Sequence, residues 1–381
     1  MQYTYIEDQQ ALIDYCQRVK HADILAVDTE FVRTRTLFPN LGLIQTYDGT
    51  TLALIDPVAV DDLKPFWQLL EDGSLCKIIH SCSEDLEVFL HSGNCKPVNM
   101  IDSQIIMSFL GNGLSMGYAA MIKHYLDIDV DKSESRTDWM RRPLSANQLD
   151  YAAADVLYLH QISQGIINEV EQAGWLEEAK AESKQQIEKK FRPIDVEHLY
   201  QENKQAWKLQ PEQLLLLKHL LIWRYEQAVK RNLPLSFVAK DHTLMILAQR
   251  NPDNVGAMAN FEGVEILDVR HKGKAMLSVL KEASALDSTE LPEAIYRLDS
   301  YPGYKQIIKS LKQYLTSLAE QQGLEIQVIA GKKQLNQFLS WFWQLNNQHN
   351  NTDNIDLLNG WRGRLFAEKL ISFAKQEFKQ P

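Results

Sequence analysis

Short runs of aliphatic and β-branched residues, each closed by polar or turn-forming residues, recur along the first part of the chain. They lie at residues 23–31, 41–48, 51–57, 76–81 and 96–103. Runs of this kind are typical of buried strands that end in turns. The first three follow one another closely, whereas the last two alternate with segments of helical periodicity. This order predicts an α/β domain with a mixed sheet.

From about residue 145 onward, apolar residues recur at helical spacing almost to the end of the chain. Residues 169–190 are an exception, because they hold six acids, four bases and few large apolar side chains. We expect a solvated helix or a linker there, followed by a break at residues 191–195, Phe-Arg-Pro-Ile-Asp. Two helical blocks come next, and residues 346–354 predict a polar loop within the second of them.

The pattern therefore predicts a multidomain protein, in agreement with its length of 381 residues. The α/β domain and its terminal linker helix are expected to occupy residues 1–193. Two all-α domains are expected at residues 208–289 and 290–381. The similar lengths of these two helical blocks are compatible with a duplication.

Composition removes membrane and secreted proteins from consideration. Hydrophobic residues make up 45% of the chain and charged residues 24%, as in ordinary globular proteins. No apolar run approaches the ~18 residues of a membrane-spanning helix, and the first residues show no secretion signal. The four cysteines form no C-x-x-C pair, which favours free thiols in a reducing compartment. We expect a cytoplasmic protein without membrane contacts.

The net charge of −10 argues against a broad binder of polyanions, because phosphate backbones attract clustered Lys and Arg. It does not exclude an enzyme that uses divalent cations and a local basic rim on a nucleic acid. One stretch, residues 132–142, has such a surplus, with four bases against two acids. The four bases are Lys132, Arg136, Arg141 and Arg142. They form either a rim that guides a polyanion or a solvated loop with internal ion pairs.

Two acids interrupt the apolar character of the first clear strand. Asp28 and Glu30 are two residues apart, so their side chains point to the same face. Burying two unpaired carboxylates is costly. One interpretation places them at an exposed strand end, paired with Arg33 and Arg35. The other is a site for a divalent cation, and ligands that are all oxygens favour Mg²⁺ or Mn²⁺.

Three further residues are equally ambiguous when each is taken alone. Asp85 lies in the first turn of a predicted helix, where the helix dipole also favours an acid. Tyr151 and Asp155 are four residues apart on the long helix, so both face one side. The three alanines between them leave this side open to close approach. Tyr151 by itself is also explained as a core tyrosine with its hydroxyl at the surface.

Taken together, these residues resemble the three motifs of the DEDD superfamily of 3′→5′ exonucleases, in its tyrosine-containing branch. The surrounding segments are similar to the ribonuclease D family: LGLIQ, HSCSEDLEVF, DKSESRTDW and RPLSANQLDYAAADVLYL. The similarity extends over the whole α/β region with few breaks. It implies a ribonuclease H-like fold for this domain.

The first helical block resembles the HRDC domain, a small helical module found in ribonuclease D and in RecQ-type helicases. The residues that carry this resemblance are Trp223, Arg224, Ala228, Asn232, Pro234, Val238, Asp241 and Leu244. The second block resembles a more divergent copy, because it lacks the Trp-Arg…Asn-x-Pro pattern at its start. The resemblance therefore implies tandem HRDC domains after the exonuclease domain.

This resemblance implies that the protein would hydrolyse RNA from the 3′ end and release nucleoside 5′-monophosphates. Asp28, Glu30 and Asp155 would hold one of two divalent cations, Mg²⁺ or Mn²⁺. Asp28 would also contact the second cation, together with Asp85, and Tyr151 would position the attacking water. The implied substrates are tRNA precursors and other structured RNAs with a free 3′ end, and the simplest assembly is a monomer.

Several alternatives remain open at this level. Phe31, which follows the two acids, would abut the terminal base or belong to the core. A 3′→5′ DNA exonuclease shares the same motifs, and the tandem HRDC modules favour RNA. A non-catalytic RNA-binding protein with this fold would be expected to lack one or more metal ligands, whereas all five positions are filled here.

Overall fold

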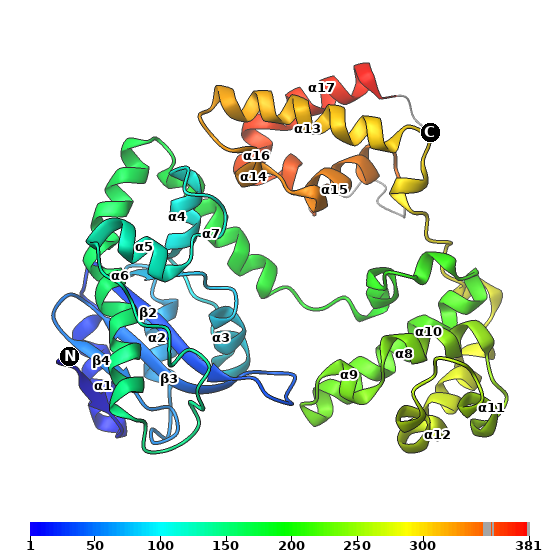
Figure 1. Cartoon of the computed structure of the whole chain (residues 1–381), viewed down its shortest axis with the longest axis horizontal. Helices are drawn as coiled ribbons and strands as arrows, with labels where there is room; N and C mark the ends of the chain where they lie inside the picture. The colour runs from blue at the N-terminus through cyan, green and yellow to red at the C-terminus, as the bar shows by residue number, and fades with distance from the viewer. Residues whose placement is uncertain (346–351, 353, 379–381) are drawn as a thin grey trace.

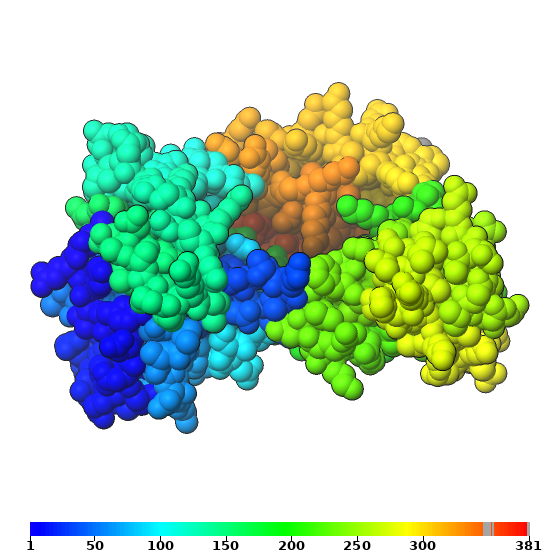
Figure 2. Space-filling model, turned by 60° about the horizontal axis from the view of Figure 1, so that its bottom comes forward, coloured from blue at the N-terminus to red at the C-terminus, as the bar shows by residue number. Residues whose placement is uncertain are grey.

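The computed structural model describes residues 1–345, 352 and 354–378. These residues form three parts around a recess, the first with a sheet and the other two helical (Figures 1 and 2). None of the helices in the described residues is both long and apolar enough to cross a bilayer. The polar loop predicted at residues 346–354 falls outside the described residues, apart from Thr352 and Asn354.

A six-stranded mixed sheet forms the centre of the first part, as expected. Its strand order is β1-β4-β3-β2-β5-β6, and β3 runs antiparallel to both of its neighbours. The strands are β1 (Thr4–Ile6), β2 (Ile24–Val32), β3 (Asn40–Tyr47), β4 (Leu52–Ile55), β5 (Cys76–Ile79) and β6 (Met100–Asp102). The sequence did not predict β1, because three residues are too few to show alternation. Its parallel pairing with β4 defines it.

Helices cover both faces of this sheet. On one face lie α1 (Gln9–Val19), α2 (Lys64–Glu71) and α3 (Asp85–Gly93); on the other lie α4 (Ser103–Phe109), α5 (Tyr118–Leu126) and α6 (Ala146–Gln172). Alternation along β2 sends Leu25 and Val27 to the side of α3 and Ala26 to the side of α6. The two faces of β2 therefore meet different helices.

Residues 169–190, for which we predicted a solvated helix or a linker, are helical over most of their length, but the helix is not solvated on all sides. Helix α7 (Leu176–Lys190) instead packs against β6 and α4. Its buried residues, Ala179, Ser183 and Ile187, recur every four positions. Two of the three are small, so the stripe carries too little hydrophobicity to be distinguished in the sequence from a solvated face.

The second part is built around α8 and its run of leucines. Its helices are α8 (Pro211–Arg231), α9 (Leu235–Val238), α10 (Asp241–Arg250), α11 (Val255–Ala259) and α12 (Ile266–Ser284). The core of this part begins before residue 208, since Tyr200 and Ala206 pack into it from the segment that precedes α8. This segment contains a short 3₁₀ helix, Val196–Glu202, that lies against α8.

The third part docks on the first through α7. Its helices are α13 (Tyr304–Gln321), α14 (Ile326–Ile329), α15 (Lys332–Phe342), α16 (Gly360–Arg362) and α17 (Glu368–Glu377). Arg362 donates to both carboxylate oxygens of Glu182 on α7. Trp361 lies against Phe109 of α4, with ring centroids 5.3 Å apart. The apolar side chains of this part and of the α6 side of the sheet form one continuous cluster.

A loop joins the first part to the second. Residues 33–39, between β2 and β3, reach the end of α8, where the blue and green surfaces meet in Figure 2. The backbone N–H groups of Leu37 and Phe38 donate to Oδ1 of Asn232 at 3.1 and 3.0 Å. Asn232 also ends α8 with a left-handed backbone, φ 48°. Its side chain therefore holds the loop while its backbone stops the helix.

Replacing Asn232 by Gly is expected to loosen this contact without disturbing α8. Glycine adopts the left-handed backbone readily but offers no side-chain acceptor. Each of the two lost hydrogen bonds is worth about 0.5–1.5 kcal/mol. The fraction of molecules in which the loop of residues 33–39 is separated from the end of α8 should therefore rise roughly tenfold. Small-angle scattering should then give a larger radius of gyration. Asn251→Gly, at the equivalent end of α10 (φ 41°), should leave the scattering unchanged, and equal curves for both variants would contradict the prediction.

Candidate metal centre

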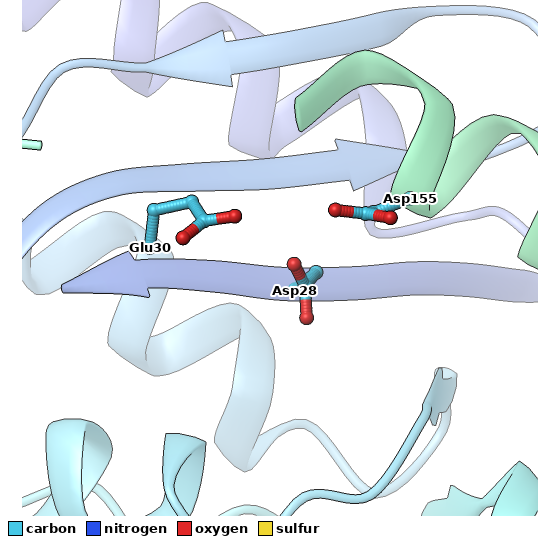
Figure 3. Close-up of side chains that lie close together, drawn as sticks. All are labelled: Asp28, Glu30 and Asp155. Carbon is cyan, nitrogen blue, oxygen red and sulfur yellow. The ribbon is translucent and has the colours of Figure 1, made fainter. Parts of the chain in front are cut away.

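Three carboxylates converge on one point between β2 and α6. Oxygen atoms of Asp28, Glu30 and Asp155 all lie within 4.8 Å of one another (Figure 3). Asp28 and Glu30 project from the same face of β2, the face that Ala26 also uses to contact the side of α6. The shared face predicted from the i, i+2 spacing is therefore the face that meets Asp155.

Local features of β2 and α6 hold these side chains in place. β2 is a central strand, bonded to β3 and β5, and its register shifts between Glu30 and Phe31. α6 begins with a capping box, in which Ser145 accepts from the Gln148 backbone and Gln148 from the Ser145 backbone. The three alanines before Asp155 are buried, and their small size lets α6 approach the sheet closely. Both elements are thus rigid supports for the acids.

Asp85 reaches the same place from the opposite side of the sheet. It is the first residue of α3 and is only 6% exposed. Its Oδ1 accepts a hydrogen bond of 2.5 Å from the hydroxyl of Thr29, which lies between the two acids of β2. Asp85 does not join the three-carboxylate group, but it lines the same cavity of about 530 Å³. The structure therefore brings all four predicted acids to one cavity.

Burial raises the pKa of every acid in this group, and repulsion from other members adds to the rise for Asp28, Glu30 and Asp155. Burial, and then the charges of Asp85 and Asp155, raise the pKa of Glu30 to about 9. The pKa of Asp28 lies well above its usual range for the same reasons. Burial raises the pKa of Asp85 to about 7 although the Thr29 hydroxyl opposes it, and that of Asp155 to about 7 although Tyr151 opposes it. Buried carboxylates that lie close together and resist ionisation in this way are suited to binding a cation, which would compensate their negative charge.

The donor atoms fit a hard divalent cation. All four acidic residues offer carboxylate oxygens, and no sulfur or imidazole belongs to the three-residue cluster of Asp28, Glu30 and Asp155. Oxygen-only ligands select Mg²⁺, Mn²⁺ or Ca²⁺ over softer metals. A cation here would offset the repulsion that the raised pKa values report. The arrangement is chemically able to hold metal and to present it to a ligand in the cavity.

Tyr151 lies beside the acids, and its hydroxyl is near enough to the carboxylate of Asp155 to oppose the rise in the pKa of that acid. The pair is on one side of α6, as the four-residue spacing predicted. Burial, reinforced by the charge of Asp155, raises the pKa of Tyr151 above its usual range, so the hydroxyl keeps its proton. Its ring packs near Trp139, with centroids 6.1 Å apart. Tyr151 therefore presents a protonated hydroxyl at the cavity wall.

The structure divides the predicted substrate-binding residues into two groups. Phe31, Lys132 and Arg136 line the cavity. Arg141 is exposed and does not line it. Arg142 is directed elsewhere, because its guanidinium donates to both carboxylate oxygens of Asp56 at 2.6 and 2.7 Å. This partner is 86 residues away and could not be read from the sequence. The local surplus of bases therefore suggested more basic residues at the rim of the cavity than the structure places there.

The sequence did not single out three other residues at the cavity. Thr29 lines the cavity, but no sequence pattern offered a reason to select it. It stands between Asp28 and Glu30, and strand alternation places its side chain on the face of the strand opposite to theirs. The Tyr118 hydroxyl lies 2.8 Å from the carbonyl oxygens of both Ala154 and Asp155, and so braces α6. His80, directly after β5, pairs with Ser103 at 2.9 Å. Neither Tyr118 nor His80 belongs to a spacing pattern that would have predicted its place.

Removing cations is expected to make the protein less stable at pH 8 than at pH 5.5. A carboxyl whose pKa is raised on folding stabilises the folded state below its unfolded pKa of about 4. That stability is lost as pH rises through the folded values, about 7 for Asp155 and about 9 for Glu30. Thermal unfolding in EDTA should show a drop of several degrees, since each kcal/mol corresponds to about 2–4 °C in a domain of this size.

Two comparisons isolate this effect from the general response of the protein to pH. Mg²⁺ should raise the unfolding temperature more at pH 8 than at pH 5.5, because ionised carboxylates bind it better. Asp155→Asn should reduce the pH-dependent drop in EDTA by removing one of the repelling charges. An unchanged drop in this variant would show that the cluster is not its cause.

Family models match each of the three parts. A model described as 3′-5′ exonuclease matches residues 3–171. A model of the HRDC domain matches residues 213–280. A model described as the C-terminal HRDC domain of ribonuclease D matches residues 302–370.

Relatives align with the chain along its whole length. Ribonuclease D of Musicola paradisiaca is 40% identical, over 97% of this chain and 98% of its own. Ribonuclease D of Escherichia coli K12 is 38% identical and covers all of both chains. The crystal structure of E. coli RNase D, an exoribonuclease involved in structured RNA processing, superposes with a TM-score of 0.95 at 37% identity over both whole chains.

Proposed function

The chain belongs to the ribonuclease D family, and from this we propose that it matures the 3′ ends of tRNA precursors and other structured RNAs. It is a 3′→5′ exoribonuclease, and its substrate is RNA. The observation that carries the proposal is the convergence of Asp28, Glu30 and Asp155 in the part that matches the exonuclease model. The product would be a nucleoside 5′-monophosphate from each cut.

Exonucleases of this type depend on metal, and we propose two divalent cations, Mg²⁺ or Mn²⁺, at the cluster. Bound there, the cations would supply the positive charge that activates water and stabilises the leaving oxygen. Asp28, Glu30 and Asp155 would hold the first cation, and Asp28 with Asp85 the second. Asp28 suits a shared role, because its pKa responds to the charges of all three other acids.

We propose that Tyr151 orients the attacking water. Its hydroxyl lies beside the carboxylate of Asp155, and burial, reinforced by the charge of Asp155, keeps the pKa of Tyr151 above its usual range. A tyrosine that retains its proton cannot act as the base at neutral pH, but it can fix a water molecule by a hydrogen bond. The Tyr151 side chain would therefore orient the attacking water, and the acids would supply the negative charge that binds the cations.

The cavity supports selection of a single-stranded end. Its volume of about 530 Å³ lies in the range of small-ligand pockets and is too small for a duplex. Lys132 and Arg136 at its wall can contact phosphate oxygens, and Phe31 offers a face for a terminal base. Trimming would therefore stop where a stem begins, because paired nucleotides cannot enter.

The distribution of charge supports a binding role for the helical domains, proposed at residues 208–289 and 290–381. Each holds 11 Lys and Arg against nine Asp and Glu, whereas the first 207 residues, which include the proposed catalytic domain at 1–193, hold 18 against 32. The helical domains are thus mildly basic beside an acidic catalytic part, which suits contact with RNA phosphates. We propose that the three domains act together as a cytoplasmic monomer.

A tRNA precursor with a 3′ extension and a 5′ label is expected to shorten one nucleotide at a time in Mg²⁺. The ladder should end near the acceptor stem, because the stem cannot enter the cavity. Product lengths on a sequencing gel, followed over time, measure this directly.

The matched control is a DNA strand of the same sequence as the extension. It should be lost more slowly than the RNA strand. Faster loss of DNA would instead identify a DNA exonuclease, and fragments from internal cuts would contradict the 3′→5′ direction.

A further inference from the structure

Asp85 enters the cavity from a different side of the sheet than the other three acids. Asp28, Glu30 and Asp155 meet on the α6 side of the sheet, whereas α3 and Asp85 belong to the opposite side. Something must therefore fix Asp85 relative to Asp28 across the strand. The hydrogen bond from Thr29, on the same strand as Asp28, makes this connection.

The connection lies where the sheet opens. β2 pairs with β5 only from Ile24 to Ala26, and β5 ends at Ile79. The chain then bends away through Ser81, whose φ is 60°, and Asp102 accepts from the backbone N–H groups of Ser81 and Cys82. Beyond Ala26, β5 no longer pairs with that edge of β2. The start of α3 lies beside this unpaired part of β2 instead. Thr29 and Asp85 meet in this opening.

The Thr29 hydroxyl is well suited to hold one carboxylate oxygen. Thr29 and Asp85 are 5% and 6% exposed, so water competes little for this bond. A β-branched side chain in a strand has few available rotamers, which keeps the hydroxyl direction fixed. Packing alone does not require the hydroxyl, because valine has the same shape. Groups that orient a metal-binding carboxylate typically change metal affinity by about 10–100-fold when removed.

We propose that Thr29 is a positioning residue, whose hydroxyl holds Asp85 at the place where it and Asp28 share the second cation. The inference rests on the proposed two-cation function and deepens it. It assigns to the middle residue of the Asp-Thr-Glu sequence a role that links the two sides of the sheet. Its effect is on cation binding and not on contact with RNA.

Two variants separate the hydroxyl from the shape of the side chain. Thr29→Val keeps the shape and removes the donor, whereas Thr29→Ser keeps the donor. Calorimetric titration of the RNA-free, full-length protein with Mn²⁺ measures affinity and stoichiometry. We expect the weaker Mn²⁺ affinity to fall about 10–100-fold in Thr29→Val and to stay within about threefold in Thr29→Ser. The Mg²⁺ concentration for half-maximal activity should rise similarly in Thr29→Val, with KM for RNA unchanged.

Each outcome bears on a separate statement. Wild-type affinity and stoichiometry in Thr29→Val, or an equal loss in Thr29→Ser, would overturn the role of Thr29 and leave the two-cation function intact. A wild-type protein that binds fewer than two Mn²⁺ would overturn the two-cation function, and this inference with it. An increase in KM for RNA at saturating Mg²⁺ would place Thr29 in RNA binding and so contradict the proposal.

Discussion

Asp28→Asn is expected to abolish RNA hydrolysis while the fold remains intact. The amide has nearly the same shape as the carboxylate but removes the charge that both cations would share. Stabilisation by bound metal is worth several kcal/mol in the transition state, so the rate should fall by about 10³-fold or more. Stability in EDTA should not fall, because one of the mutually repelling charges is gone. Rates on a short RNA and thermal unfolding in EDTA measure the two effects.

Asp150→Asn is the matched control for this variant. Asp150 lies on the same helix as Asp155, but its side chain is 53% exposed and pairs with the N-terminal amine at the surface. Its loss should change the rate by less than twofold. An Asp28→Asn protein that kept a tenth of the wild-type rate in Mg²⁺ would exclude Asp28 as a shared metal ligand.

Arg362→Met is expected to destabilise the third part by about 3–5 kcal/mol, the usual cost of removing one partner of a buried ion pair. The guanidinium of Arg362 is buried and donates to Glu182 of α7. It also donates to the carbonyl oxygens of Val328 and Ile329 at 2.9 and 2.6 Å. Methionine would leave these acceptors without a donor. Urea denaturation followed by tryptophan fluorescence would report the change, because Trp361 lies beside the pair.

Arg364→Met provides the comparison. Arg364 also faces α7, where it pairs with Glu178 at 3.1 Å, but its side chain is 64% exposed. Exposed pairs contribute about 0–1 kcal/mol, so this variant should unfold almost as the wild type does. Equal destabilisation by both substitutions would mean that burial does not distinguish the two pairs.

The sequence predicted those parts of the site that depend on local geometry. Asp28 and Glu30 share a face because a strand alternates, and Tyr151 and Asp155 share a face because a helix repeats near four residues. The assignment of Asp85 to the same site came from the order of motifs in the family. Its link to Thr29 depends on where β5 leaves the sheet, which no local pattern records.

The remaining differences arise from partners that are distant in sequence. Arg142 was predicted at the rim because the bases around it outnumber the acids, but it binds Asp56 in a different element. The charged residues of α7 were predicted to face solvent. Glu182 among them instead accepts hydrogen bonds from Arg362, which is 180 residues away in the sequence. In both places a charge that is unpaired in its local sequence finds its partner only through the tertiary fold.

We propose that four acids from both sides of the sheet hold two divalent cations. Anomalous scattering from crystals of the protein soaked in Mn²⁺ tests it most directly. Two peaks are expected, one between Asp28, Glu30 and Asp155, and one between Asp28 and Asp85. A single peak, or peaks only outside this cavity, would contradict it.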